Sequence, residues 1–141
     1  MRYLSAAEVW DIHLEVADQA LRLGKPVFGP ACRDQALLES AVAQPRQGFG
    51  GVDLYPGIFE KAAVVARGII CGHVFLDGNK RTGLAAAALF LEYNGWDFHL
   101  PVDDLKALAL DIAGIRERGG EPIPISEIAG RLKDGSKRIA S

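Results

Sequence analysis

The residue types best suited to chemistry gather in one short stretch of the chain. In order, it reads His73, Val74, Phe75, Leu76, Asp77, Gly78, Asn79, Lys80, Arg81 and Thr82. The stretch lies between the two most apolar helical patterns, where burial should be deepest and polar residues are least expected. It combines a histidine that can accept a proton, a carboxylate and two adjacent cations. These groups are the parts needed to move a phosphate-bearing group onto a hydroxyl.

A helix is predicted to begin at Asn79 or Lys80. The first turn of a helix presents N–H groups without intrahelical partners and a partial positive charge, so Gly78, Asn79 and Lys80 can hold phosphate oxygens. Lys80 and Arg81 add two full charges. Cations are locally unfavourable at the positive end of a helix, and a bound anion is therefore the simpler explanation for both.

Each of these residues also has an ordinary structural explanation. His73 can be incidental, as most single histidines are, and Asp77 can be no more than a helix cap or part of an Asp-Gly turn. Phe75 is expected to anchor the segment in the core. His13 and His99 sit in ordinary sequence surroundings, and we assign them no role. The residue types alone leave both interpretations open.

A second unusual segment is rich in glycine and has no apolar period. It comprises Gln47, Gly48, Phe49, Gly50, Gly51, Val52, Asp53 and Leu54. Clusters of glycine between periodic segments indicate loops and turns, so we expect an exposed, mobile loop or a short hairpin. Glycine content does not distinguish a functional loop from an idle one.

Six helical patterns account for most of the chain and predict an all-α fold, a compact bundle without internal repeats. They cover residues 5–23, 34–44, 56–72, 79–93, 102–118 and 126–133. Ser5 and Glu8 form a capping-box pattern, and Gly72 is expected to close the third helix in a left-handed conformation. We expect one domain over residues 1–134 and a solvated tail over residues 135–141.

Composition excludes several classes of protein. The chain has 141 residues, 49% apolar and 24% charged, which suits one folded domain. Sixteen Lys and Arg against eighteen Asp and Glu give a net charge of −2, without the basic excess that direct nucleic-acid binding needs. The longest apolar run, Leu84–Leu91, is too short to span a membrane, and no secretory pattern follows Met1. Cys32 and Cys71 show no zinc spacing, so we expect a cytoplasmic protein with reduced, partly buried thiols.

The central stretch resembles the motif of a known family. The pattern His73-x-Phe75-x-Asp77-Gly78-Asn79-Lys80-Arg81-Thr82-x-Leu84 is similar to that of the Fic/Doc superfamily, and in detail to its Doc (death-on-curing) branch, the toxins of toxin–antitoxin pairs. Flanking segments are also similar, so the resemblance covers about Tyr3 to Gly120. It implies the compact helical Fic fold.

The resemblance implies a role for each motif residue. His73 would take the proton from a hydroxyl of a target protein, and Asp77 would hold Mg²⁺ or orient His73. The residues implied to bind the nucleotide phosphates are Gly78, Asn79, Lys80 and Arg81. The glycine-rich segment, residues 47–54, would correspond to the flap that holds the target peptide by backbone pairing.

The Doc branch further implies which group is transferred. Lys80 stands where adenylyltransferases of the family usually have Gly, and Leu84 where they have a second Arg. Both features imply phosphoryl transfer from ATP to a Ser/Thr hydroxyl, with elongation factor Tu as the target and translation as the process inhibited. A separate antitoxin is the expected inhibitor, because the family's inhibitory helix motif is absent. An adenylyl or other nucleotidyl transferase, and a catalytically silent binding module, remain the alternatives.

Overall fold

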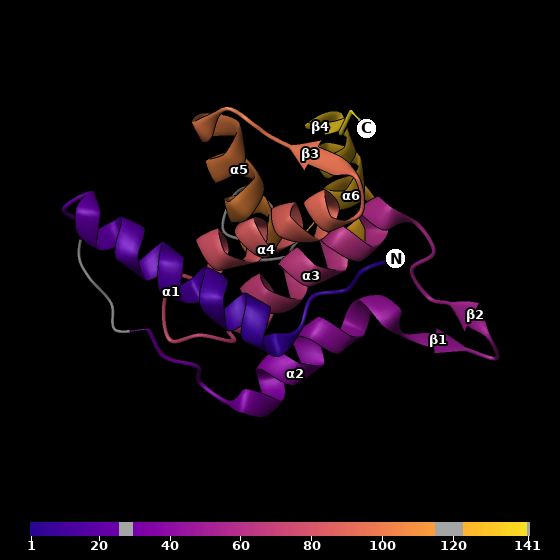
Figure 1. The fold of residues 1–141 in the computed structure, drawn as a ribbon, viewed down its shortest axis with the longest axis horizontal. Helices are drawn as coiled ribbons and strands as arrows, with labels where there is room; N and C mark the ends of the chain where they lie inside the picture. Colours follow the sequence, from indigo (N-terminus) through magenta and orange to yellow (C-terminus); the bar gives the residue numbers. More distant parts are fainter. Residues whose placement is uncertain (26–29, 115–122, 141) are drawn as a thin grey trace.

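The computed structural model describes residues 1–25, 30–114 and 123–140, and these are mostly helical, as the sequence predicts. In chain order the elements are α1 (Ala6–Arg22), α2 (Gln35–Ala43), the 3-10 turn η1 (Gln44–Arg46), β1 (Gly48–Phe49), β2 (Val52–Asp53), α3 (Ile58–Gly72), α4 (Asn79–Tyr93), β3 (Trp96–Phe98), α5 (Val102–Ala113), α6 (Ile125–Asp134) and β4 (Ser136–Arg138). Figure 1 shows α3 and α4 side by side at the centre, with α1 on the left, α2 below them and α5 above. The helix α6 packs against α3.

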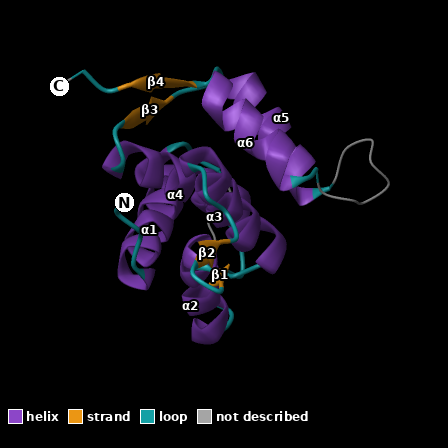
Figure 2. Cartoon of the chain, turned by 90° about the vertical axis from the view of Figure 1, so that its right-hand side faces the viewer, coloured by secondary structure: helices purple, strands orange, loops and turns teal. Residues whose placement is uncertain are grey.

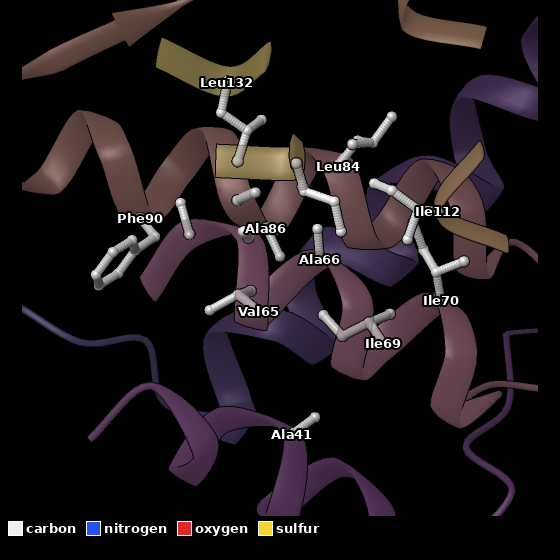
Figure 3. Packing of buried hydrophobic residues seen from close by; sticks show 14 of the residues in the cluster. Ala41, Val65, Ala66, Ile69, Ile70, Leu84, Ala86, Phe90, Ile112 and Leu132 are labelled. Atoms are coloured by element: carbon white, nitrogen blue, oxygen red, sulfur yellow. The ribbon is translucent and has the colours of Figure 1, made fainter. Parts of the chain in front are cut away.

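The close approach of α3 and α4 depends on a glycine. A Cβ atom on Gly83 would lie 2.7 Å from Ile70 Cγ1 and 3.1 Å from the carbonyl oxygen of Ala66, so any side chain there would push the helices apart. Figure 3 shows the surrounding core, which includes Val65, Ile69, Leu84, Ala86, Phe90, Ile112 and Leu132. The helix whose sequence is apolar on every face is α4, and it lies at the centre of the bundle.

The helix boundaries follow local capping chemistry. The Glu8 N–H donates to Ser5 Oγ at 3.1 Å and the Ser5 N–H donates to Glu8 Oε1 at 2.9 Å, which confirms the capping box at the start of α1. The helix α5 ends at Ala113, where Gly114 takes a left-handed conformation. The rest of the predicted fifth helix, residues 115–118, lies outside the described residues.

The C-terminal segment has exposed side chains over residues 137–140, and part of its backbone forms a strand. Its strand β4 pairs antiparallel with β3 (Figure 2). Trp96 lies opposite Arg138 in the register, and the Arg138 guanidinium lies 4.8 Å from the Trp96 ring centroid. The side chains of Lys137 and Arg138 are exposed, but the backbone is paired. Backbone pairing and the stacking of Arg138 on Trp96 hold strand β4. The strand therefore needs no alternation of apolar residues, and its sequence shows none.

The helices and the two cysteines bear on the predictions that concern membranes and thiols. In the described ranges no helix is long and apolar enough to cross a bilayer. Cys32 and Cys71 are both free thiols. Cys32 is half-buried as expected, whereas Cys71, in the last turn of α3, is exposed.

Candidate active site

The chain leaves α3 through a left-handed residue, and that residue is His73. Its φ is 47° and its ψ is 50°, and among residues 1–25, 30–114 and 123–140 it is the one non-glycine residue with a positive φ. We expected Gly72 to take this conformation, but Gly72 is the last residue of the helix. A side chain at positive φ costs free energy, and such strain concentrates at functional sites.

The loop after His73 is held by a two-way amide clamp. The Phe75 N–H donates to Asn79 Oδ1 and the Asn79 Nδ2 group donates to the Phe75 carbonyl, both at 2.9 Å. Phe75 is only 1% exposed, which confirms it as a core anchor. The side chain of Asn79 therefore shapes the loop, and its backbone N–H is the group left to meet a phosphate.

The start of α4 carries no side-chain cap. The N-cap residue is Gly78, in a left-handed conformation with φ of 78°. Because glycine has no side chain, it cannot cap the first turn with a hydrogen bond. Asp77 is not the cap: its Oδ1 accepts from the Gly78 N–H at 2.7 Å, before the helix begins. The N–H groups of the first turn therefore have no capping side chain, and such a helix end binds anions.

The charged residues of the motif face solvent around this open helix end. His73, Asp77, Lys80 and Arg81 are all exposed, and the first turn of α4 contains no acidic residue. The described residues contain no group of three or more His, Cys, Asp or Glu side chains that could hold a metal on its own. Magnesium commonly uses one protein carboxylate plus the phosphates of its nucleotide, and Asp77 fits that mode.

Two contributors to the site come from distant parts of the sequence. His13 of α1 is fully buried and stacks on Phe75, with ring centroids 3.8 Å apart. Residues 31–33 run antiparallel to the motif loop: the Arg33 N–H donates to the Val74 carbonyl at 2.9 Å and the Leu76 N–H to the Ala31 carbonyl at 3.0 Å. Sequence reasoning missed both, because one histidine and one loop carry no motif.

The glycine-rich segment forms a short hairpin, which is one of the two structures that its sequence predicts. Gly50 and Gly51 both have positive φ, 60° and 79°, which a tight two-residue turn between β1 and β2 requires. The hairpin joins the N-terminal end of α3, whereas the motif follows its C-terminal end (Figure 1). A helix of 15 residues is about 22 Å long, so the hairpin does not lie beside His73.

The surface also has a concavity of about 430 Å³ between α1 and α2, away from the charged motif residues. Its lining residues are Ala6, Ala7, Trp10, Cys32, Gln35, Leu38 and Glu39. None of residues 73–82 lines it. The uncapped end of α4 is thus not part of this concavity.

Comparison with known proteins agrees with the motif. The family model described as "Fic/DOC family" matches residues 3–91, which is well over half of the chain. A curated relative, "Toxin Doc" of Mycolicibacterium smegmatis, is 42% identical over 80 residues. That alignment covers 55% of this chain and 62% of the relative, so the match spans less than two thirds of the relative's length. The matched region contains the strained histidine, the amide clamp and the uncapped helix, and the chain belongs to the Fic/DOC family.

Proposed function

We propose that this chain is a Doc-type toxin that transfers the γ-phosphoryl group of ATP to a Ser/Thr hydroxyl of a protein. The observation that carries the proposal is the uncapped start of α4, with Lys80 and Arg81 in its first turn, directly after a histidine held at positive φ. Family membership supports group transfer to proteins, and the Doc relative supports the toxin branch.

Each exposed motif residue has a step in this reaction. The target oxygen attacks the γ-phosphorus, its proton passes to the imidazole of His73, and the bond to the bridging oxygen of ADP breaks. Arg81 and the backbone N–H groups of the first turn hold phosphate oxygens, and Lys80 offsets the charge that builds during transfer. Asp77 would hold Mg²⁺, which would supply positive charge against that of the nucleotide phosphates.

The direction of nucleotide binding must come from side chains, because backbone N–H groups recognise oxygens and not the order of phosphates. Leu84 is 5% exposed and belongs to the core, so this position offers no cation to draw in the terminal phosphates. Lys80 instead adds a cation at the helix end. Both features favour phosphoryl over adenylyl transfer, and adenylyl transfer is the competing outcome of the test.

We further propose elongation factor Tu as the target, the cytoplasm as the compartment and a separate antitoxin as the inhibitor. The basis is the likeness to a protein named Toxin Doc. The hairpin β1–β2 exposes Phe49 (93%), Val52 (70%) and Leu54 (60%). We assign it to contact with the target protein, at a distance from the transfer site and not as a clamp beside His73.

The test uses ATP labelled separately at its α and γ positions. Each is incubated with the chain, Mg²⁺ and a bacterial lysate, and the labelled protein is identified. The proposal predicts γ-label on elongation factor Tu and none in a His73→Ala control. Label from the α position would show adenylyl transfer, and label on another protein would remove elongation factor Tu as the target.

A further inference from the structure

We infer that His13 is a positioning residue that holds the motif loop, residues 73–78, in place against the start of α4. His13 lies sixty positions before His73 in the chain. The inference deepens the proposed function, since it assigns a residue outside the motif to the geometry of transfer. It stands on two contacts made by one buried side chain, one to each flank of the anion-binding turn.

The first contact is a ring stack. The imidazole of His13 lies on the ring of Phe75 with centroids 3.8 Å apart and planes 10° apart. Trp10, one helical turn earlier on α1, lies near both rings, at 5.7 Å from His13 and 6.1 Å from Phe75. Since His13 and Phe75 are 0% and 1% exposed, the stack fixes the middle of the loop between His73 and α4.

The second contact is a hydrogen bond to α4. His13 Nδ1 and Thr82 Oγ1 are 3.2 Å apart, and Thr82 is fully buried. The Thr82 N–H donates to the Gly78 carbonyl at 3.0 Å, so this bond reaches the turn where the phosphate-binding N–H groups lie. One side chain of α1 thereby holds both the loop and the helix start.

The two contacts meet through the amide clamp. Asn79, the first residue of α4, is hydrogen-bonded to the backbone of Phe75. His13 stacks on Phe75 and is hydrogen-bonded to Thr82. A shift of Phe75 would therefore move the loop that carries His73 and Asp77 relative to the anion-binding turn. Because transfer requires reacting groups to be positioned within fractions of an ångström, we expect His13 to affect the chemical step more than nucleotide binding.

The test separates the two contacts with three variants of the full chain. His13→Phe keeps a ring for the stack but loses the hydrogen bond, His13→Asn keeps an amide near the Nδ1 position but loses the stack, and His13→Ala loses both. The matched control is Val9→Ala. Val9 lies one turn earlier on the same helix, is also 0% exposed, and belongs to the main hydrophobic cluster.

Two quantities are measured. The first is the set of backbone NMR order parameters for residues 73–79 of the chain alone, which should fall in His13→Ala and not in Val9→Ala. The second is transfer from ATP to elongation factor Tu, for which kcat should fall by about tenfold to 10²-fold in His13→Ala while the KM for ATP changes little. Each single-contact variant should recover part of this loss.

The outcomes are distinct. The inference is overturned if His13→Ala matches Val9→Ala in both quantities, or if it raises the KM for ATP and leaves kcat intact. If His13→Ala does not fold, the Phe and Asn variants decide by the same criteria. If the wild-type chain modifies no protein, the proposed function fails, and the order parameters alone then decide whether His13 positions the loop.

Discussion

The two ends of α3 are built in opposite ways. At the C-terminal end the charged side chains are exposed, and buried uncharged groups, Phe75 and Thr82, hold the loop beneath them. At the N-terminal end a lysine is buried, and apolar side chains of the hairpin are exposed. There Lys61 is 1% exposed, donates from Nζ to the Pro45 carbonyl at 3.0 Å and lies 3.4 Å from Asp53 Oδ2 of the hairpin.

The difference between the two ends supports the proposal that an anion binds at the C-terminal end of α3, where α4 begins. The Lys61 ammonium is buried and bonded to the Pro45 carbonyl and the Asp53 carboxylate, so a ligand in solvent does not reach it, and these bonds tie β2 to the body of the protein. An uncapped helix start with two exposed cations leaves its donors unused in the fold. Variants at the C-terminal end of α3 should therefore change transfer and nucleotide binding. Variants at its N-terminal end should change only how firmly the hairpin is held.

The largest effect is expected from His73→Ala at the C-terminal end. Because the imidazole is exposed, its loss should leave the fold intact while removing the proton acceptor, and transfer should fall by about 10²- to 10⁴-fold. The rate of label transfer measures the effect, and circular dichroism checks the fold. A folded alanine variant with the wild-type rate would show that His73 is not the base.

Arg81→Ala should weaken ATP binding by about ten- to hundredfold, since hydrogen bonds to charged groups contribute roughly 1.5–3 kcal/mol. His73→Ala should change affinity less, because the base acts in the transition state. Calorimetric titration of both variants with ATP and Mg²⁺ gives the comparison. Equal affinities would take Arg81 out of the phosphate site.

The buried histidine should make the C-terminal end sensitive to pH. Burial lowers the pKa of His13 below its ordinary value of 6.5, and the nearby charge of Asp77 opposes this only in part. The unfolded chain therefore binds a proton first as the pH falls below 6.5, so stability should decrease by at most about 1.4 kcal/mol per pH unit. Urea unfolding of wild type and His13→Asn tests this, and an equal decrease in both would exclude His13 as the cause.

His73→Gly should be more stable than His73→Ala by roughly 1 kcal/mol, although we expect both variants to lose transfer activity. Glycine adopts positive φ without steric cost, and this gain outweighs its greater freedom in the unfolded chain. Thermal unfolding of the two variants measures the difference. If the alanine variant is the more stable one, position 73 is not strained, and strain is no mark of this end of α3.

The smallest effect is expected at the hairpin end. Lys61→Met replaces a buried ammonium with an apolar side chain of similar length and leaves Asp53 in solvent, so stability should change by no more than about 1 kcal/mol. ATP affinity should not change. Denaturant unfolding and calorimetry check both, and a weaker affinity for ATP would mean that the two ends of α3 are not independent.

Much of the fold and the contiguous part of the site could be predicted from sequence. The capping box at Ser5 and the bounds of α4 follow from local chemistry and apolar period, which one sequence displays directly. The motif could be found because its residues are adjacent. Its geometry could not: glycine is the usual left-handed residue at a helix end, so the sequence predicts that conformation for Gly72, whereas the structure has it at His73.

What the sequence could not give depends on contacts between distant segments. The contacts of His13 with Phe75 and Thr82 join segments far apart in the sequence, and only the packing of α1 against the motif loop reveals them. The hairpin could be predicted from Gly50 and Gly51, but its distance from His73 follows from the length and direction of α3. Strand β4 depends in the same way on a backbone partner forty positions away.

The most direct test of the proposed reaction is the intact mass of purified elongation factor Tu after incubation with the chain, ATP and Mg²⁺. We predict a gain of one phosphoryl group, lost on substitution of the target hydroxyl and absent with His73→Ala. A gain the size of an adenylyl group would contradict the assignment of phosphoryl transfer while leaving the family assignment intact. An unchanged mass with the wild-type chain would contradict the proposed target.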